Sequence, residues 1–197
     1  MAIKVLGVGG SMREDSYSTR TVRLCLESAR QRGAEIQLLD LRTAGLPMFR
    51  PDAEAQAAIE EIGSLVQWAD AFVLGSPDYH GSMSGAMKNF LDFHWEEFAG
   101  KLFAYVCASH EKGLTVMEQM RTAVRQCYGW SLPYGVSVHS EHDFDNSGAI
   151  SNARLQGRLE MLARDLTIYG ELIHGQFIRD LNDRSSNSFA ARYIDLG

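Results

Sequence analysis

Hydroxyl side chains and one guanidinium gather in the segment GVGGSMREDSYST, residues 7–19, at the end of a short apolar run. Ser11, Ser16, Ser18 and Thr19 supply the hydroxyls, and Arg13 supplies the charge. Hydroxyls and backbone N–H groups at the start of a helix bind phosphate, because the helix dipole favours an anion there. Arginine adds charge-assisted, bidentate hydrogen bonds. The segment therefore predicts a site for a terminal phosphate monoester; the alternative is helix capping, for which one hydroxyl is enough.

The glycines of this segment do not complete a known nucleotide motif. A G-x-G-x-x-G motif that uses Gly7 and Gly9 needs a third glycine where the chain has Met12. The Gly-Lys-Ser/Thr of a P-loop does not follow either. We therefore expect a phosphate monoester here and not the bridging pyrophosphate of a dinucleotide.

A second segment with chemical potential is GSPDYHGSMSGAMKNFLDF, residues 75–93. Pro77 stiffens a turn, and Gly81 permits a positive φ, which lets backbone amides face outward together. A planar, apolar ring with carbonyl and ring-nitrogen acceptors can stack against Tyr79 while those amides bond its edge. Ser82 or Ser84 is expected to cap the helix that follows.

Other patterns point to chemistry without completing it. GSMSG resembles the nucleophile elbow of hydrolases, but Met83 stands where the serine is required. Asp143 and Asp145 begin a calcium-loop pattern in which Arg154 replaces the bidentate glutamate. His139 and His142 have no spacing typical of a transition-metal site. We expect no metal site and identify no catalytic side chain.

Composition sets further limits. The 197 residues, 45% of them apolar, suffice for one core, so we expect a single domain. The net charge of -6 argues against nucleic acid or an anionic membrane as partner. No apolar stretch approaches the roughly 18 residues of a membrane span, and we expect a soluble, cytoplasmic protein. The three cysteines, Cys25, Cys107 and Cys127, stand apart in apolar contexts, which favours small buried side chains over disulfides, zinc ligands or reactive thiols.

Strand-like and helix-like segments alternate along the chain. Helical periodicity covers residues 21–33, 53–70 and 149–173, and apolar runs of strand length cover residues 3–8, 35–41, 71–75, 102–108 and 132–138. Alternation of this kind predicts an α/β fold with a doubly wound five-stranded parallel sheet, in flavodoxin-like order 2-1-3-4-5 or as a Rossmann half. Ligands of such sheets bind at the carboxyl ends of the strands, so the loops after the first, third and fourth strands are the expected site.

Together, GSMREDSYS and GSPDYHGSMSGAMKNFLDF resemble the NAD(P)H-dependent FMN reductase family of flavodoxin-like proteins, which includes flavin, quinone, azo and chromate reductases. The resemblance extends by its strand and helix layout over about residues 3–170 and implies the order 2-1-3-4-5. We expect the flavodoxin-like domain to cover residues 1–175; residues 176–197 lack a clean period and are expected to be disordered or to lie at a subunit interface. It implies FMN as cofactor, with its phosphate on Ser11, Arg13, Ser16 and Ser18. The flavin-contacting turn would comprise Pro77, Asp78, Tyr79, His80, Gly81 and Ser82. In place of the glycine-rich loop of many members, the chain has SHEKG, from which Ser109 and His110 are candidate flavin neighbours.

The activity implied is transfer of hydride from NADPH or NADH to FMN and then of two electrons to a small-molecule acceptor, with ping-pong kinetics. Quinones, free flavins, azo dyes and metal oxyanions or chelates are candidate acceptors. The alternatives are a flavodoxin-type electron carrier that binds FMN without oxidising NAD(P)H, and a nucleotide-binding or regulatory domain without redox activity. The family resemblance and a surplus of aromatic residues predict a homodimer or homotetramer; the residues concerned are Phe90, Phe93, His94, Trp95 and Phe98.

Overall fold

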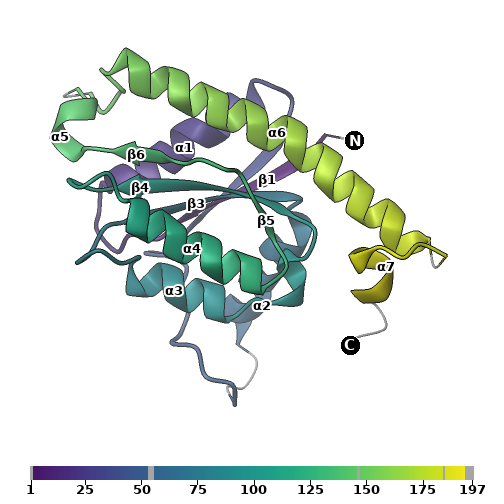
Figure 1. Cartoon of the computed structure of the whole chain (residues 1–197). Coiled ribbons are helices and arrows are strands. Elements are labelled where there is room, and N and C mark those ends of the chain that lie inside the picture. The colour runs from purple at the N-terminus through teal and green to yellow at the C-terminus, as the bar shows by residue number, and fades with distance from the viewer. Residues whose placement is uncertain (1, 53–55, 146, 184, 194–197) are drawn as a thin grey trace.

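A twisted parallel sheet runs through the centre of the structure, with helices on both of its faces (Figure 1). The computed structural model describes residues 2–52, 56–145, 147–183 and 185–193. The strands are β1 (Lys4–Gly9), β2 (Glu35–Asp40), β3 (Ala71–Pro77), β4 (Leu102–Ala108), β5 (Trp130–Ser131) and β6 (Val136–Val138). Their order, β2-β1-β3-β4-β5 with β6 also paired to β4, confirms the predicted flavodoxin-like topology in a single domain.

The strands differ in composition according to their place in the sheet. All seven residues of the central strand β3 are buried, because helices cover both of its faces. The predicted strand over residues 132–138 is wrong in its extent: the chain pairs with β4 at β5 and again at β6, with a gap between them. Pro133 lies in that gap and has no N–H to give to a ladder, which accounts for the interruption.

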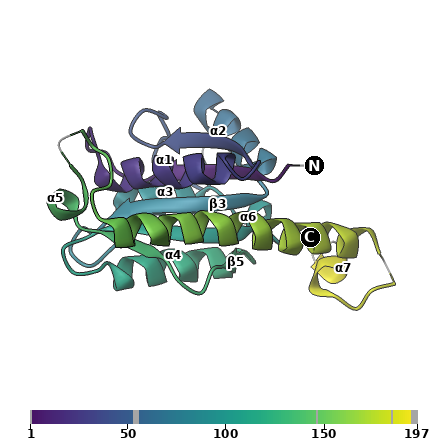
Figure 2. The same cartoon turned by 90° about the horizontal axis from the view of Figure 1, so that it is seen from above.

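Two helices cover one face of the sheet and three cover the other. The first pair is α1 (Tyr17–Arg30) and α6 (Ala153–Asn182), which lie side by side in Figure 2. The opposite face carries α2 (Ala57–Trp68), α3 (Gly85–Asp92) and α4 (Leu114–Gln126). Shorter elements are η1 (Glu96–Phe98), α5 (Ser140–Asp143) and α7 (Phe189–Tyr193). Strand β3 hydrogen-bonds β1 and β4 along its length, so the loops after these three strands leave the sheet at one edge.

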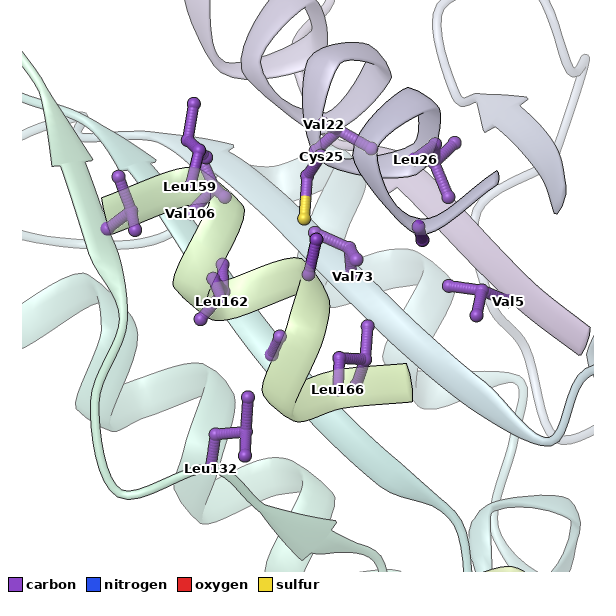
Figure 3. Close-up of a cluster of buried hydrophobic side chains, with 14 of the residues drawn as sticks. Val5, Val22, Cys25, Leu26, Val73, Val106, Leu132, Leu159, Leu162 and Leu166 are labelled. Carbon is purple, nitrogen blue, oxygen red and sulfur yellow. The ribbon is translucent and has the colours of Figure 1, made fainter. Parts of the chain in front are cut away.

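The core on the α1 and α6 face is aliphatic. Figure 3 shows Val22 and Cys25 of α1, Leu162 of α6, and Val73 and Val106 of the sheet as members of this one buried cluster. Burial raises the pKa of the Cys25 thiol to about 12, so it packs as a small apolar group. The same holds for Cys107, whose pKa also rises to about 12, whereas Cys127 is only partly buried. The three thiols are free, as expected from their spacing.

Several helices begin or end away from their predicted positions. Helix α1 starts at Tyr17 and not at residue 21, because Ser16 caps it. The boundary expected at residue 175 falls inside α6, which continues to Asn182 and is followed by α7. Residues 53–55 of the second predicted helix, and residues 184 and 194–197 of the predicted tail, lie outside the described part. Within the described ranges, no helix combines the length and apolar character needed to cross a membrane.

Candidate active site

A pocket opens where β1, β3 and β4 end. It has a volume of about 160 Å³. We call it the edge pocket, and it is lined by Ser11, Arg13, Ser16, Tyr17, Pro77, Asp78, Tyr79, Ala108, Ser109 and His110. Eight of the twelve predicted cofactor-binding residues line it; Ser18, His80, Gly81 and Ser82 do not. A pocket of this size is smaller than the roughly 300 Å³ or more that enclose a whole drug-sized ligand, so it has room for only part of a molecule of that size.

The loop after β1 enters α1 through a capped turn. Ser16 is the N-cap, and its Oγ accepts from the backbone N–H of Thr19 at 3.4 Å. Ser16 therefore caps the helix, which was the alternative to phosphate binding in the sequence analysis. Ser11 and the exposed side chain of Arg13 take no part in the cap. Those two donors line the edge pocket beside the N-terminus of α1, where the dipole favours an anion. Ser18 is fully buried and supports Ser16 through an Oγ–Oγ hydrogen bond of 2.9 Å.

At the start of the loop after β1, the backbone lies close to the end of β3. The N–H of Gly10 donates to the carbonyl of Gly75 at 2.7 Å, which joins the end of β1 to β3. A Cβ on Gly10 would lie 2.9 Å from the Cβ of Met87 and 3.0 Å from the Gly75 carbonyl oxygen. Gly10 thus permits the close packing of the end of β1 against β3 and α3.

The loop after β3 is a tight turn closed by its own backbone. Tyr79 and Ser82 exchange two backbone hydrogen bonds of 3.0 and 3.1 Å, and His80 and Gly81 have φ values of 58° and 75°. The N–H of Gly81 donates to Oδ1 of Asp78 at 2.8 Å. The amides of Tyr79, Gly81 and Ser82 are therefore engaged inside the turn, contrary to the expectation that they face outward together.

Tyr79 projects from this turn and is 48% exposed. An aromatic ring held on a rigid turn at the mouth of a pocket offers a face for a second planar ring to stack on. Ser84, and not Ser82, caps α3: its Oγ accepts from the N–H of Met87 at 3.1 Å. Tyr79 thus offers an exposed aromatic face at the pocket mouth, whereas the amides of the turn are engaged within it.

The side chain of Gln119, on α4, hydrogen-bonds the turn after β3 at three points. Its Oε1 accepts from Ser82 Oγ at 2.9 Å and from the N–H of Met83 at 3.1 Å. Its Nε2 donates to the carbonyl of Gly81 at 3.3 Å. Sequence reasoning missed this residue, because nothing in the helical pattern of α4 distinguishes a glutamine that reaches back to the turn.

Asp78 connects the turn to the loop after β4. While its Oδ1 accepts from Gly81, its Oδ2 accepts from Ser109 Oγ at 2.7 Å. Ser109 Oγ in turn accepts from the N–H of Glu111 at 3.0 Å. Because each oxygen of the Asp78 carboxylate accepts a hydrogen bond, the side chain is held in one orientation. Asp78 therefore forms the pocket wall between the two loops.

The loop after β4 contributes His110, which is exposed and lines the pocket. Its Nδ1 lies 3.1 Å from Nε2 of His139, a residue that follows β6. The ring of His139 also packs on the ring of His142 at a centroid distance of 4.5 Å. In the described part of the chain, no group of three or more His, Cys, Asp or Glu side chains is arranged to hold a metal ion.

Two lining residues were not predicted, Tyr17 and Ala108. Tyr17 follows the N-cap directly, and its ring packs on Phe144 at 5.1 Å, so its place depends on a segment far along the chain. Ala108 ends β4 beside Pro77, and its backbone carbonyl accepts from the N–H of Asp78 at 2.9 Å. Both positions follow from tertiary contacts that no local pattern signals.

This geometry fits a phosphorylated ligand that carries a planar ring. Ser11, Arg13 and the N-terminus of α1 supply hydroxyl, guanidinium and amide donors at one end of the edge pocket. Pro77 and Tyr79 supply an apolar face at the other end. The small enclosed volume suits a phosphate and its chain, while the exposed Tyr79 leaves a stacked ring accessible to a second molecule.

Comparison with known proteins gives a consistent match. The family model described as NADPH-dependent FMN reductase matches residues 3–143. The chain is 32% identical over 114 residues to an NAD(P)H-dependent FMN reductase of Pseudomonas aeruginosa, an alignment that covers 54% of this chain and 60% of that protein. It is 28% identical over 144 residues to an NADPH azoreductase of a Bacillus species, which covers 70% and 81%.

A third relative is an NAD(P)H:quinone oxidoreductase of Solanum tuberosum, 31% identical over 97 residues that cover 46% of this chain and 49% of that protein. The chain thus spans about half to four fifths of the length of these relatives. Among solved structures, the flavoenzyme FerB, an NAD(P)H:acceptor oxidoreductase from Paracoccus denitrificans, superposes with a TM-score of 0.74 at 18% identity, over 87% of this chain and 99% of that one. At that identity the likeness supports the fold alone.

Proposed function

Because the chain belongs to the NADPH-dependent FMN reductase family, we propose that it is an FMN-dependent NAD(P)H oxidoreductase whose cofactor binds in the edge pocket. The observation that carries the proposal is the pairing, in one pocket, of phosphate donors from the loop after β1 with the Tyr79 platform from the loop after β3. FMN has a phosphate at one end and a planar ring at the other. The pocket offers a complement to each.

The residues divide into those that contact the cofactor and those that hold the contacting residues. Ser11, Arg13 and Ser16 bind the phosphate at the N-terminus of α1. Pro77, Tyr79, Ser109 and His110 border the ring. Ser18 supports Ser16, Asp78 ties the two loops together, and Ser82 anchors the turn through Gln119, with His80 and Gly81 giving the turn its shape.

When bound, FMN supplies the redox chemistry, taking a hydride from NAD(P)H and passing two electrons to an acceptor. The chain's own contribution is position and access. The exposed side chains of Tyr79 and His110 at the pocket rim leave one face of a stacked ring open to solvent, and we propose that donor and acceptor use that face in turn. That arrangement gives ping-pong kinetics. The names of the Bacillus and Solanum relatives support azo compounds and quinones as acceptor classes, beside free flavins and metal oxyanions or chelates.

We also propose that the protein acts as a homodimer or homotetramer in the cytoplasm, where NAD(P)H is the available donor. The aromatic surplus predicted after β3 supports this less than expected. Phe90 and Phe98 are fully buried in the core and His94 is 5% exposed, which leaves Trp95, 60% exposed, as the clearly surface-exposed member. The support that remains is family membership.

The test is a steady-state analysis of the FMN-loaded protein. NADPH oxidation is measured at several fixed concentrations of 1,4-benzoquinone, and parallel double-reciprocal lines are expected. Intersecting lines would contradict the ping-pong order while leaving the reductase activity in place. Absence of NADPH oxidation with quinone, azo dye, ferric chelate and free FMN would favour the flavodoxin-type electron carrier, and a protein that binds no FMN would favour a domain without redox activity.

A further inference from the structure

Two imidazoles meet at the rim of the edge pocket. His110 lines the pocket, and its Nδ1 lies within hydrogen-bond distance of His139 Nε2, at 3.1 Å. The rings are 4.7 Å apart between centroids and inclined by 79°. Because Nδ1 of His110 is engaged by His139, its remaining ring nitrogen, Nε2, is the one available for a pocket ligand.

The position of His139 is set by the loop after β6. Its backbone N–H donates to Oδ2 of Asp143 at 2.6 Å, and Oδ1 of Asp143 accepts from Nδ2 of Asn152 at 2.7 Å. Asn152 is the N-cap of α6, so this chain of hydrogen bonds ties the loop to the longest helix of the fold. His139 is therefore held where it can orient the more exposed His110.

The other charged groups that line the edge pocket are less suited to exchange a proton. Both carboxylate oxygens of Asp78 accept hydrogen bonds, from Gly81 and from Ser109. Arg13 lies at the phosphate end and keeps its proton under all physiological conditions. Histidine, in contrast, can take up and release a proton near neutral pH, and a second imidazole as hydrogen-bond acceptor stabilises its charged form.

We propose that His110 is the proton donor to a quinone-type acceptor at the rim of the edge pocket and that His139 is its positioning residue, an inference that rests on the function proposed above. Reduction of a quinone to a hydroquinone consumes one hydride and one proton. Bound FMN, once reduced by NADPH, would supply the hydride, and its addition to the quinone would leave an anionic quinol oxygen. The Nε2–H bond of doubly protonated His110 breaks as the O–H bond of the hydroquinone forms. His110, now neutral, keeps its Nδ1–H bonded to His139 and takes a new proton from water, to which it is exposed.

Several charged groups surround this pair and contribute to its pH dependence. Glu111 and Lys112 follow His110 on the same loop, and Asp78 faces it through Ser109. His142 and Asp143 face His139 from the loop after β6, and Arg13 lines the opposite pocket wall. The variants below leave all of these in place, so a change in the pH profile reports on the two imidazoles.

The first test compares two acceptors on the FMN-loaded protein. Ferricyanide accepts an electron without a proton, whereas 1,4-benzoquinone needs one. In His110→Asn, kcat/KM for benzoquinone is expected to fall by about tenfold more than kcat/KM for ferricyanide, because only the quinone needs the proton. In His139→Phe, the pH profile for benzoquinone should change, because His110 loses its ring partner, while the ferricyanide profile stays unchanged. His174→Asn, at the far end of the sheet beside Asp70, is the matched control.

Loss with both acceptors alike, or no loss with benzoquinone, would overturn the proton-donor role while leaving the reductase function standing. If the wild-type protein oxidises NADPH with neither acceptor, both the proposed reductase function and the proton-donor role of His110 are contradicted.

A second readout needs neither FMN nor turnover. In the cofactor-free protein labelled with ¹⁵N-histidine, His139→Phe should shift the ring-nitrogen signals of His110, because Nδ1 loses its partner. His174→Asn should leave those signals in place. Unchanged His110 signals in His139→Phe would mean that the two rings do not interact in solution, and His139 would lose its positioning role.

Discussion

Oδ2 of Asp78 lies 2.7 Å from Oγ of Ser109, and this hydrogen bond joins the turn after β3 to the loop after β4. The other oxygen of the same carboxylate accepts from the N–H of Gly81 at 2.8 Å. One side chain thus fixes both walls of the edge pocket on the ring side. The proposed cofactor site is therefore a product of loop-to-loop hydrogen bonds as much as of direct contacts.

Asp78→Ala should weaken FMN binding by about tenfold without unfolding the protein. Both hydrogen bonds of the carboxylate are lost, and a hydrogen bond to a charged group is worth about 1.5–3 kcal/mol. The dissociation constant is measured by quenching of FMN fluorescence. Asp52→Ala, which removes an exposed carboxylate paired with Arg50, is the control and should bind FMN like the wild type. Unchanged affinity in Asp78→Ala would show that the two loops hold their positions without it.

Arg13→Ala distinguishes binding of the cofactor's phosphate from binding of its ring. FMN and riboflavin share the ring but only FMN has a phosphate, so the substitution should weaken FMN binding by about 10- to 100-fold and riboflavin binding by less than about twofold. Arg50→Ala removes an exposed arginine outside the edge pocket and serves as control. Equal losses for the two flavins would place the phosphate away from the loop after β1.

Alanine substitutions at Gly10 and Gly63 compare a glycine packed closely at the start of the site with a glycine that has free space around it. Gly10→Ala would bring a Cβ within 2.9 Å of Met87 and 3.0 Å of the Gly75 carbonyl, and should lower the free energy of unfolding by about 1–3 kcal/mol. Gly63→Ala, in α2 with no atom within 4 Å of the new Cβ, should raise it by about 0.5–1 kcal/mol. Urea denaturation measures both. A Gly10→Ala protein as stable as the wild type would show that β1 and α3 can separate freely.

His94 should make the fold sensitive to acid. Burial lowers the pKa of this imidazole from its usual 6.5 to about 4, so the folded state favours the neutral ring. The stability that this provides is complete above pH 6.5 and is lost as the pH falls from 6.5 towards 4. Between pH 7.5 and pH 5 the free energy of unfolding should fall by about 2 kcal/mol more in the wild type than in His94→Leu. His142→Asn, an exposed histidine, is the control; equal pH dependence in wild type and His94→Leu would contradict the burial argument.

The sequence predicted the sheet and most of the pocket because both depend on local patterns. Parallel strands covered on both faces are apolar runs, and the residues of the predicted phosphate site, the hydroxyls of Ser11 and Ser16 and the guanidinium of Arg13, stand close together in the chain. The topology then brings the loops after β1, β3 and β4 to one edge. Eight predicted residues lie around a single pocket for that reason.

What the sequence did not predict depends on contacts between distant segments. Gln119 reaches the turn at Gly81 from α4, and His139 reaches His110 from the loop after β6. The direction of the turn's amides also escaped prediction, because Asp78 and the pairing of Tyr79 with Ser82 engage them internally. The aromatic residues after β3 suggested an exposed subunit interface, but Phe90 and Phe98 are fully buried in the core.

The central claim, that NAD(P)H reduces FMN held in the edge pocket, is tested most directly by adding NADPH to the FMN-loaded protein without oxygen and without any acceptor. The flavin absorption near 450 nm should bleach with one equivalent of NADPH and return when benzoquinone is added. In Arg13→Ala at subsaturating FMN, the bleached fraction should fall in proportion to the bound cofactor. A wild-type protein whose flavin stays oxidised with NADPH and with NADH, yet is bleached by dithionite, would contradict the reductase assignment.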